Sequence, residues 1–338
     1  MMILRPIQQC DYPALLKIAH ESGHGFTSLP NNEELLQKKI DHSISSFAKS
    51  ASHPGDEGYL FVLEDSETGE VVGTSAIEAA VGLDDAFYHY HLSKAIHSSR
   101  TLNVYKAVDI LTLCNDYTGA TELCTLFLKD GYRKNNNGKL LSKARFMFIK
   151  QHQERFAETV IAEMRGVSNE QGSSPFWQWL EEHFFSMDFP TADYLTGIGQ
   201  KVFIAELMPK YPIYVNLLSK EAQAVIGKVH NNTRPAIELL KSEGFTFNGY
   251  VDIFDAGPTV EAKVDNIATI RNAKNFTVKI GENSGETTVM LANEKLNDFR
   301  ATVAQLNFAA TSEDITLSQA MADALHLQAG DIVTAVSL

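Results

Sequence analysis

A short basic loop, set between a strand pattern and a helix pattern, carries residue types that could bind a phosphate group. The apolar run 123–128 predicts a strand, and apolar residues spaced i, i+1, i+4, i+7 and i+8 over 140–148 predict an amphipathic helix. The polar residues of interest in the loop between them are Arg133, Asn136, Gly138 and Lys139. A helix start presents unpaired backbone N–H groups and the positive end of its dipole, and glycine lets an anion approach the backbone. The loop is therefore a candidate pyrophosphate cradle.

The same pattern has an ordinary structural explanation, because a strand, a polar turn and an amphipathic helix recur throughout α/β proteins. The spacing matches neither the nucleotide P-loop nor the dinucleotide-binding fingerprint. It resembles the Arg/Gln-x-x-Gly-x-Gly/Ala signature of the GNAT acyltransferases, with Asn136 in place of the first glycine. In those proteins the loop holds the pyrophosphate of coenzyme A.

Composition limits the classes of partner. The chain has 338 residues, enough for two or three domains, of which 44% are hydrophobic and 21% charged. Its net charge of −13 argues against nucleic acid as a partner, since phosphate backbones select basic surfaces. Three cysteines without metal-ligand spacing predict free thiols, no metal site and a reducing cytoplasm. The N-terminus lacks a signal-peptide layout, and no apolar run of about 18 residues predicts a membrane span.

The order of the predicted elements also resembles the GNAT order. The first half reads as a strand at 2–7, helices at 11–19 and 32–47, strands at 59–63 and 71–77, and then the strand and helix described above. The second half reads as a strand at 159–164, helical pieces at 176–185 and 191–194, a strand at 201–208, a helix at 233–242 and paired strands within 245–254. The run 236–245 is similar to the late helix and turn of GNAT folds.

We therefore expect an α/β (α+β) chain with a GNAT-like acyl-CoA transferase fold, in which helices flank a mixed and mostly antiparallel sheet. Residues 1–150 are expected to form the acyl-CoA-binding region and residues 151–258 the second part of the acyltransferase body. After residue 258 the chain lacks long helices until 317–325 and alternates Val, Ile and Thr with polar residues. This pattern predicts a small β-barrel-like C-terminal domain over 259–338.

Longer blocks of sequence resemble the arginine N-succinyltransferase family. They cover roughly residues 1–258 and comprise 27–30, 75–83, 115–116, 122–128, 140–146, 162–166, 174–177, 203–209 and 250–255. One departure is Ala256, where the family pattern has glycine. We expect this difference to affect a turn rather than the chemistry.

The resemblance implies transfer of a succinyl group from succinyl-CoA, a co-substrate, to the α-amino group of L-arginine, the first step of arginine catabolism by the succinyltransferase pathway. It implies no permanently bound cofactor. It also implies that the backbone of Leu126 contacts the acyl-CoA and that His230 is the proton donor. The expected CoA-binding residues are Leu126, Phe127, Leu128, Arg133, Asn136, Gly138 and Lys139.

Aminolysis of a thioester requires a neutral amine, a stabilised oxyanion and a proton for the departing thiolate. A histidine with its ordinary pKa of about 6.5 could give or shuttle that proton near neutral pH. Taken without the family resemblance, His230 is better explained as a helix cap or a surface residue. His24, in a Gly-rich loop, could line the substrate pocket or lie on the surface.

An arginine substrate needs carboxylates that pair with its planar guanidinium. Four acidic residues lie on or beside strands that we expect to reach the site, and these candidates are Glu78, Asp116, Glu122 and Glu163. A solvated strand end or a structural salt bridge would explain each of them equally well. Arg165 or Lys143 could pair with the succinyl carboxylate.

Three other interpretations stay open. The chain could acylate ornithine or another basic amino acid, because a few pocket residues would change the substrate. It could be a sensor of CoA or amino acids that has lost catalysis, although such a protein would be expected to lack His230. It could also be a non-catalytic subunit. The expected partners are the small-molecule substrates and a homo-oligomer or a related subunit, with no nucleic acid and no membrane.

Overall fold

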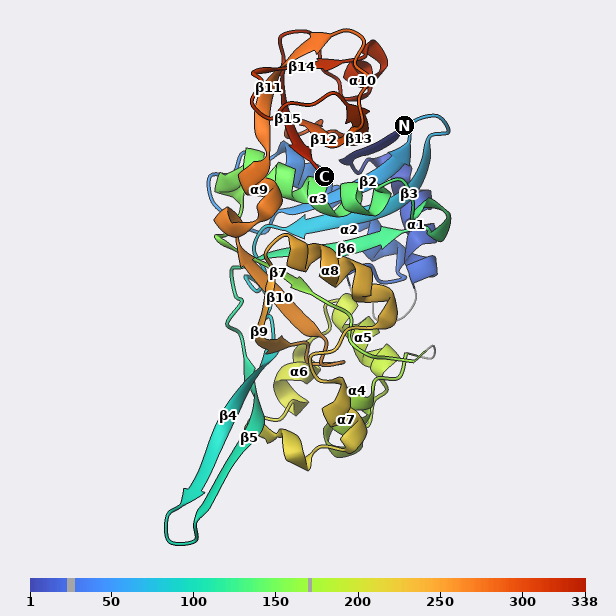
Figure 1. Cartoon of the computed structure of the whole chain (residues 1–338). Coiled ribbons are helices and arrows are strands. Elements are labelled where there is room, and N and C mark those ends of the chain that lie inside the picture. Colours follow the sequence, from blue (N-terminus) through green and yellow to red (C-terminus); the bar gives the residue numbers. More distant parts are fainter. Residues whose placement is uncertain (23–27, 170–171) are drawn as a thin grey trace.

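A computed structural model describes residues 1–22, 28–169 and 172–338 of the chain. Figure 1 shows an elongated molecule, with a β-rich C-terminal region at one end and a long hairpin projecting from the other. His24, named above as a possible pocket residue, lies outside the described residues.

The N-terminal elements confirm the predicted order of strands and helices. In chain order they are β1 (Met2–Pro6), α1 (Tyr12–Ser22), α2 (Glu33–Ala48), β2 (Gly58–Asp65) and β3 (Glu70–Glu78). The side chain of Asn32 accepts a hydrogen bond from the backbone N–H of Leu35, which caps the first turn of α2.

The next elements contain the strand and helix on either side of the basic loop. They are β4 (His89–Ser99), β5 (Val104–Cys114), β6 (Thr121–Leu128), α3 (Asn137–Gln151) and β7 (Thr159–Glu163). β4 and β5 form the projecting hairpin, whose register runs from His89 opposite Cys114 to Ser99 opposite Val104. The strands predicted at 123–128 and 159–164 and the helix predicted after the loop are confirmed.

A group of short helices follows. These elements are α4 (Pro175–Leu180) with a π-helical turn after it (Glu181–Phe185), α5 (Phe189–Gly197), α6 (Val202–Leu207), β8 (Ile213–Tyr214), α7 (Lys220–Val225) and α8 (Arg234–Ser242). The strand predicted over 201–208 is wrong, because this segment contains α6. Ile204 and Met208 are both buried in one apolar cluster, and their spacing of four residues places them on one face of a helical turn. A short apolar run does not distinguish a strand from a helix by periodicity alone.

The last elements complete the body and build the C-terminal region. They are β9 (Thr246–Val251), β10 (Pro258–Lys263), α9 (Ala268–Asn272), β11 (Lys274–Ile280), β12 (Thr287–Asn293), β13 (Ala301–Leu306), β14 (Asp314–Leu317), α10 (Gln319–Ala324) and β15 (Ile332–Ser337). Between β9 and β10, Ala256 has a φ of 54°, a left-handed conformation that favours glycine. The departure from the family pattern therefore lies in a turn, as expected.

The strands of the described residues join into one mixed sheet. Their order across it is β14-β11-β15-β12-β13-β1-β2-β3-β6-β7-β10-β9-β4-β5-β8. The pairs β6–β7 and β11–β14 are parallel and the other neighbouring pairs are antiparallel. β1 pairs with β13, which joins the C-terminal strands to the body. The predicted fold class, a mixed and mostly antiparallel sheet with flanking helices and a β-rich C-terminal region, is confirmed.

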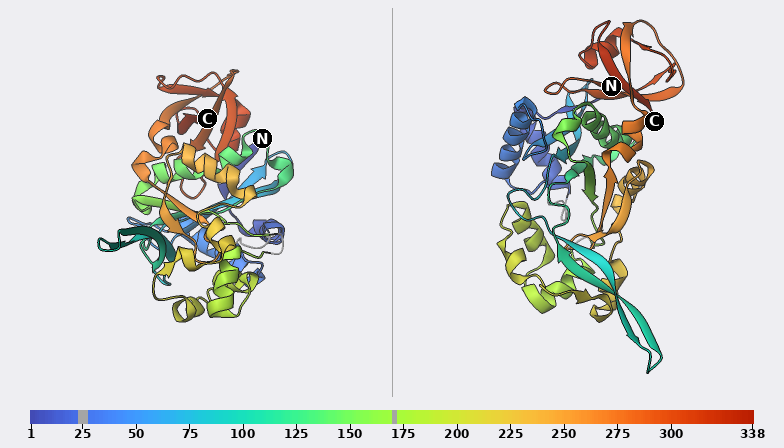
Figure 2. Two further views of the ribbon diagram at one scale, coloured as in Figure 1. Left: turned by 60° about the horizontal axis from the view of Figure 1, so that its bottom comes forward. Right: turned by 90° about the vertical axis from the view of Figure 1, so that its left-hand side faces the viewer.

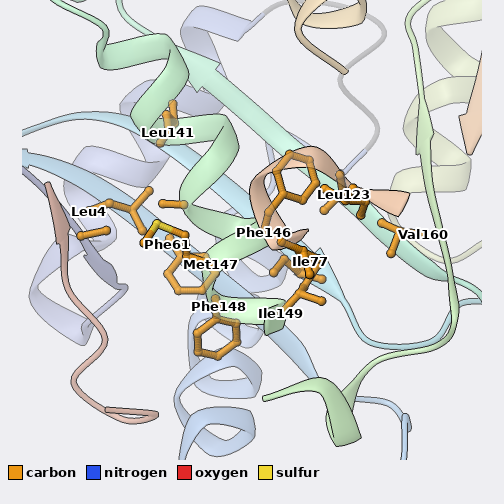
Figure 3. Close-up of a cluster of buried hydrophobic side chains, with 14 of the residues drawn as sticks. Leu4, Phe61, Ile77, Leu123, Leu141, Phe146, Met147, Phe148, Ile149 and Val160 are labelled. Atoms are coloured by element: carbon orange, nitrogen blue, oxygen red, sulfur yellow. The ribbon is translucent and has the colours of Figure 1, made fainter. Parts of the chain in front are cut away.

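The main core lies between the sheet and α3. Figure 3 shows side chains of α3, among them Met147 and Phe148, directed toward Leu4 and Phe61 of neighbouring strands. α3 is less amphipathic than predicted, since Phe146 and Ile149 are also fully buried. The views of Figure 2 show α3 enclosed between the sheet and the C-terminal region, which accounts for the burial of its other faces. Near the start of α3, just after the basic loop, Leu140 and Leu141 are buried in this core.

Candidate functional site

A fork between β6 and β7 opens into a cavity. The two strands pair in parallel at Thr121 with Val160 and at Glu122 with Ile161, and these are the pairs found in the described residues. Beyond these pairs, a cavity of about 830 Å³ separates the strands. It is lined by residues 122–127 of β6 and by residues 162–165, which span the end of β7 and the two residues after it. Backbone groups on this edge of β6 are therefore available to a ligand rather than to a neighbouring strand.

β6 carries an unusual backbone conformation inside the fork. Thr125 has a φ of 54° and is buried, and the β3–β6 register shifts between Thr74 and Ala76 opposite it. Such a conformation is a genuine outlier for a β-branched residue and costs roughly 1–3 kcal/mol. Strain of this kind persists where the surrounding structure enforces it, and it re-aims the backbone of β6 toward the cavity.

Arg145 of α3 lies behind this bulge. Its side chain is 2% exposed and also lines the cavity. One Nη donates to the carbonyl oxygens of Ala76 and Cys124 at 3.3 and 3.4 Å, and the remaining contacts are to the carbonyl and hydroxyl of Ser142. Burial lowers the pKa of Arg145 to about 10, and no carboxylate pairs with it in the described residues. A positive charge is thus fixed behind the strand at the point where the strand bulges.

Four carboxylates gather at the other end of the fork. Those that line the cavity here are Glu122, Glu163, Asp252 and Asp255. Burial, followed by the charges of Glu163 and Glu78, raises the pKa of Glu122 to about 8. Burial and the charge of Asp252 raise the pKa of Asp255 well above its ordinary value. This end of the cavity therefore retains protons at neutral pH, and a bound cation would displace them.

His89 contacts one of these carboxylates from outside the cavity lining. It is fully buried, and its Nε2 lies 2.9 Å from a carboxylate oxygen of Glu163. Burial lowers the pKa of His89 and raises that of Glu163, which favours a neutral imidazole facing a protonated carboxyl group. His89 lies in β4, and its contact with Glu163 was not predicted from the sequence.

The other two predicted carboxylates lie apart from the cavity wall. Glu78 stands opposite Glu122 in the β3–β6 register and accepts a hydrogen bond from Lys39 at 3.1 Å. Asp116 accepts a hydrogen bond from the hydroxyl of Tyr250 at 2.9 Å. The structure therefore brings Glu122 and Glu163 together in the cavity and leaves Glu78 and Asp116 outside its lining.

The basic loop lies beyond the C-terminal end of β6. Leu126, Phe127 and Arg133 line the cavity, whereas Leu128 is buried and its carbonyl accepts from Nε of Arg133 at 3.0 Å. Asn136, which precedes the first turn of α3, takes a left-handed conformation with a φ of 63°.

The helix start beside this loop is open to solvent. Gly138 and Lys139 lie in the first turn of α3, where Lys139 is exposed. A Cβ added to Gly138 would meet no atom of the described structure within 4 Å. This side of Gly138 is therefore open, which a large anion at the helix start would require.

Arg165 lines a third side of the cavity, and His230 lies next to Arg165 but outside the lining. The backbone N–H of His230 donates to the carbonyl of Arg165 at 2.9 Å, and Asn232 and Thr233, just after it, line the cavity. Nδ1 of His230 accepts from the backbone N–H of Asn232 at 3.2 Å, so the proton of the neutral ring lies on Nε2, which can donate it. Burial and then the positive charge of Arg165 lower the pKa of His230, so the neutral imidazole dominates at neutral pH.

The two cations predicted to pair with a succinyl carboxylate, Arg165 and Lys143, lie in different surroundings. Arg165 lines the cavity, and its buried Nε has no hydrogen-bond partner in the described structure. Lys143 instead pairs with buried Glu243 at 2.7 Å and is absent from the cavity lining. Arg165 is therefore the cation that is positioned to receive an anion.

Sequence reasoning missed Thr125, Arg145, Asp252 and Asp255 as site residues. All four belong to blocks on which the family resemblance was based, which was an available signal. The sequence did not predict that these four residues meet at one cavity, because Asp252 and Asp255 reach it through the pairing of β10 with both β9 and β7.

Comparison with known proteins gives one consistent result. The chain matches the family model described as arginine N-succinyltransferase beta subunit over residues 2–269 and the model of its C-terminal domain over residues 274–337. It is 49% identical to an arginine N-succinyltransferase of Enterobacter sp. (strain 638) and 48% identical to one of Yersinia pestis (strain Pestoides F), with 100% of this chain and 98% of each relative covered. It is similar to the structure of arginine/ornithine succinyltransferase subunit AI from Pseudomonas aeruginosa, with a TM-score of 0.92, 38% identity, and coverage of 100% of this chain and 98% of that one.

Proposed function

The chain belongs to the arginine N-succinyltransferase family, and from this premise we propose that it transfers the succinyl group of succinyl-CoA to the α-amino group of L-arginine. The α-amine attacks the thioester carbonyl carbon, the C–S bond breaks, and the proton lost by the amine goes to the CoA thiolate. The products are N2-succinyl-L-arginine and CoA.

The separation of charge along β6 carries this proposal. Carboxylates gather at the Glu122 end, and the basic loop with Arg133 and Lys139 follows the Leu128 end. At that end Lys129 also lines the cavity, and Asp130 pairs with Arg133 at 2.9 Å. Six residues at about 3.3 Å each separate these ends by roughly 20 Å. A cavity with this polarity suits a cationic amino acid at one end and the pyrophosphate of an extended acyl-CoA at the other, with the uncharged stretch of β6 between them.

Each part of the reaction has residues that support it. The guanidinium of arginine would pair with Glu122 and Glu163, and the succinyl carboxylate with Arg165. Backbone N–H groups of the bulged strand near Leu126 would stabilise the oxyanion, with Arg145 holding the bulge from behind. His230 would donate its Nε2 proton to the departing thiolate, and the proton lost by the amine would replace it on the ring.

A thiol-release assay tests the activity. We expect fast release of CoA from succinyl-CoA with arginine and slower release with ornithine or acetyl-CoA. His230→Ala should lower kcat by about 100-fold or more, the usual contribution of a positioned acid or base. A preference for ornithine would keep the mechanism and change the substrate. Binding of succinyl-CoA without turnover would favour the sensor or non-catalytic subunit.

The second candidate substrate is ornithine, since the similar P. aeruginosa protein is named an arginine/ornithine succinyltransferase. The same name calls that protein a subunit, and we propose that the present chain forms a homo-oligomer. The cysteines of the described residues, Cys10, Cys114 and Cys124, are free thiols, which supports a cytoplasmic location. No described helix is long and apolar enough to cross a membrane.

A further inference from the structure

We propose that the β4–β5 hairpin, here called the arm, docks on a second copy of this chain. The inference rests on the homo-oligomer proposed above and specifies the surface that forms it. Figures 1 and 2 show the arm projecting away from the rest of the molecule. Three observations on the described residues, taken in turn below, indicate what covers it.

The outer arm lacks the support of neighbouring strands. β4 pairs with β9 at Tyr90 and His91, and β5 pairs with β8 at Ile110 and Leu111. From there to the tip the described structure has two strands and no third. An isolated two-stranded ribbon is marginally stable in water, and its free edges offer backbone groups for pairing. The arm therefore gains stability from a partner that covers it.

Four large apolar side chains are exposed on the outer arm. The exposed ones are Ile96, Leu102, Val104 and Tyr105, of which Tyr105 is 72% exposed. Ser98 stands opposite Tyr105 and Ile96 opposite Ala107 in the register, so Ile96 and Tyr105 share one face of the ribbon. An exposed apolar face centred on an aromatic residue is characteristic of a protein interface.

A second apolar surface adjoins the base of the arm. Its exposed members are Val202, Leu207, Tyr211 and Leu217, of which Tyr211 is 86% exposed. We call it the base patch. Tyr211 and Leu217 flank β8, which pairs with the inner part of β5, so this part of the base patch lies beside the base of the arm. A two-fold contact requires one self-complementary surface, and here the arm of each copy would cover the base patch of the other.

Charge favours a copy of this chain as the occupant. Residues 89–114 contain Lys94, Arg100 and Lys106 and one acid, Asp109, a net charge of +2. The chain as a whole carries −13, so the remainder carries −15. A basic arm is attracted to the acidic body of a second copy and steers the approach of two molecules that otherwise repel.

The test is the mass of the full chain in solution, measured by sedimentation velocity without substrate. We expect the wild type to be a dimer. The double variant Ile96→Glu/Tyr105→Glu on the arm and the single variant Tyr211→Glu on the base patch should each be monomers. The matched control is Ile280→Glu, which places the same charge on an exposed apolar position of β11 at the opposite end of the molecule and should remain a dimer. A wild-type monomer, or dimers that persist in both sets of variants, would overturn the proposal.

Two further measurements guard against misfolded variants. A shortened arm, with residues 95–108 replaced by Asn-Gly, joins Lys94 to Asp109 through a two-residue hairpin turn and should be a folded monomer. Hydrogen exchange of the wild-type arm amides should be slow at high protein concentration and fast on dilution. Fast exchange at every concentration would contradict docking. Because neither mass nor exchange requires turnover, a failed enzyme assay would leave this result unaffected.

Discussion

Glu122 and Glu78 stand opposite each other in the β3–β6 register, yet Lys39 lies 3.1 Å from Glu78 and no salt bridge of the described structure reaches Glu122. The two carboxylates therefore have different roles, although they are paired across neighbouring strands of the sheet. Glu78 belongs to a structural ion pair, whereas Glu122 faces the cavity with its pKa raised to about 8 by burial and neighbouring charges. This contrast gives two predictions.

The first prediction concerns stability and pH. Because the folded protein holds the proton of Glu122 more tightly than the unfolded chain does, its contribution to stability is greatest below about pH 4.5 and falls as pH rises to about 8. Glu122→Gln cannot ionise and should be more stable than the wild type at pH 9 relative to pH 5, by roughly 1–3 kcal/mol. Urea unfolding at pH 5, 7 and 9 measures this difference.

The comparison for that experiment is Glu78→Gln. It leaves Lys39 without its hydrogen-bonded carboxylate and should lower the free energy of unfolding at all three pH values. If the Glu122→Gln and wild-type stabilities ran parallel from pH 5 to pH 9, Glu122 would not hold a proton in the folded protein.

The second prediction concerns proton release on arginine binding. A guanidinium beside Glu122 and Glu163 favours their ionised forms, so binding at pH 7 should release protons to the buffer. Calorimetric titration of the protein with arginine in two buffers of different ionisation enthalpy gives the number released. Glu122→Gln should release fewer protons and bind more weakly. Equal binding enthalpies in the two buffers would exclude this site for the guanidinium.

Elements with local signals were predictable from the sequence, and the convergence of distant residues was not. The β6 strand followed from its apolar run and α3 from its apolar spacing. Arg145 was missed because a charged residue at the spacing of Leu141 and Phe148 interrupts the apolar pattern and gives no sign that it lines a cavity. Its four contacts come partly from β3 and β6, which no local pattern reveals.

The length of the β4–β5 arm was also not predicted. No strand was predicted within 89–114, because the outer arm alternates too weakly between apolar and polar residues. Its stability depends on what covers it, which is a property of the assembly rather than of the local sequence. The same reasoning applies to α6, whose helical conformation is selected by the burial of Ile204 and Met208 in one cluster.

The third prediction concerns the choice of acyl group. Arg165→Met keeps much of the side-chain volume and removes the charge whose Nε has no partner in the described residues. We expect kcat/KM for succinyl-CoA to fall roughly 10- to 100-fold, since a charge-assisted hydrogen bond contributes about 1.5–3 kcal/mol. Acetyl-CoA, which lacks the second carboxylate, serves as the internal control and should change little. An equal loss with both acyl-CoAs would assign Arg165 to catalysis or to folding instead.

The fourth prediction concerns Arg145 as a positioning residue. Its guanidinium bridges the carbonyl oxygens of Ala76 and Cys124 beside the strained Thr125, so it holds the bulge of β6 without needing to touch the substrate. Arg145→Ala should lower kcat about 10-fold or more and leave KM for arginine nearly unchanged, because the geometry of the oxyanion donors is lost while the carboxylates remain. Steady-state kinetics below the unfolding temperature of the variant measures both constants.

The matched control is Arg155→Ala. Arg155 is also buried, and it donates to the hydroxyl of Tyr59 at 2.9 Å and to the carbonyl of Lys49 at 2.6 Å, but it does not line the cavity. Its loss should destabilise the fold and leave kcat of the folded enzyme unchanged. Added methylguanidine should restore part of kcat to Arg145→Ala, since the vacated space opens to the cavity, and should have no such effect on Arg155→Ala. If both variants lost stability and kcat in parallel and neither responded to methylguanidine, Arg145 would be a structural residue alone.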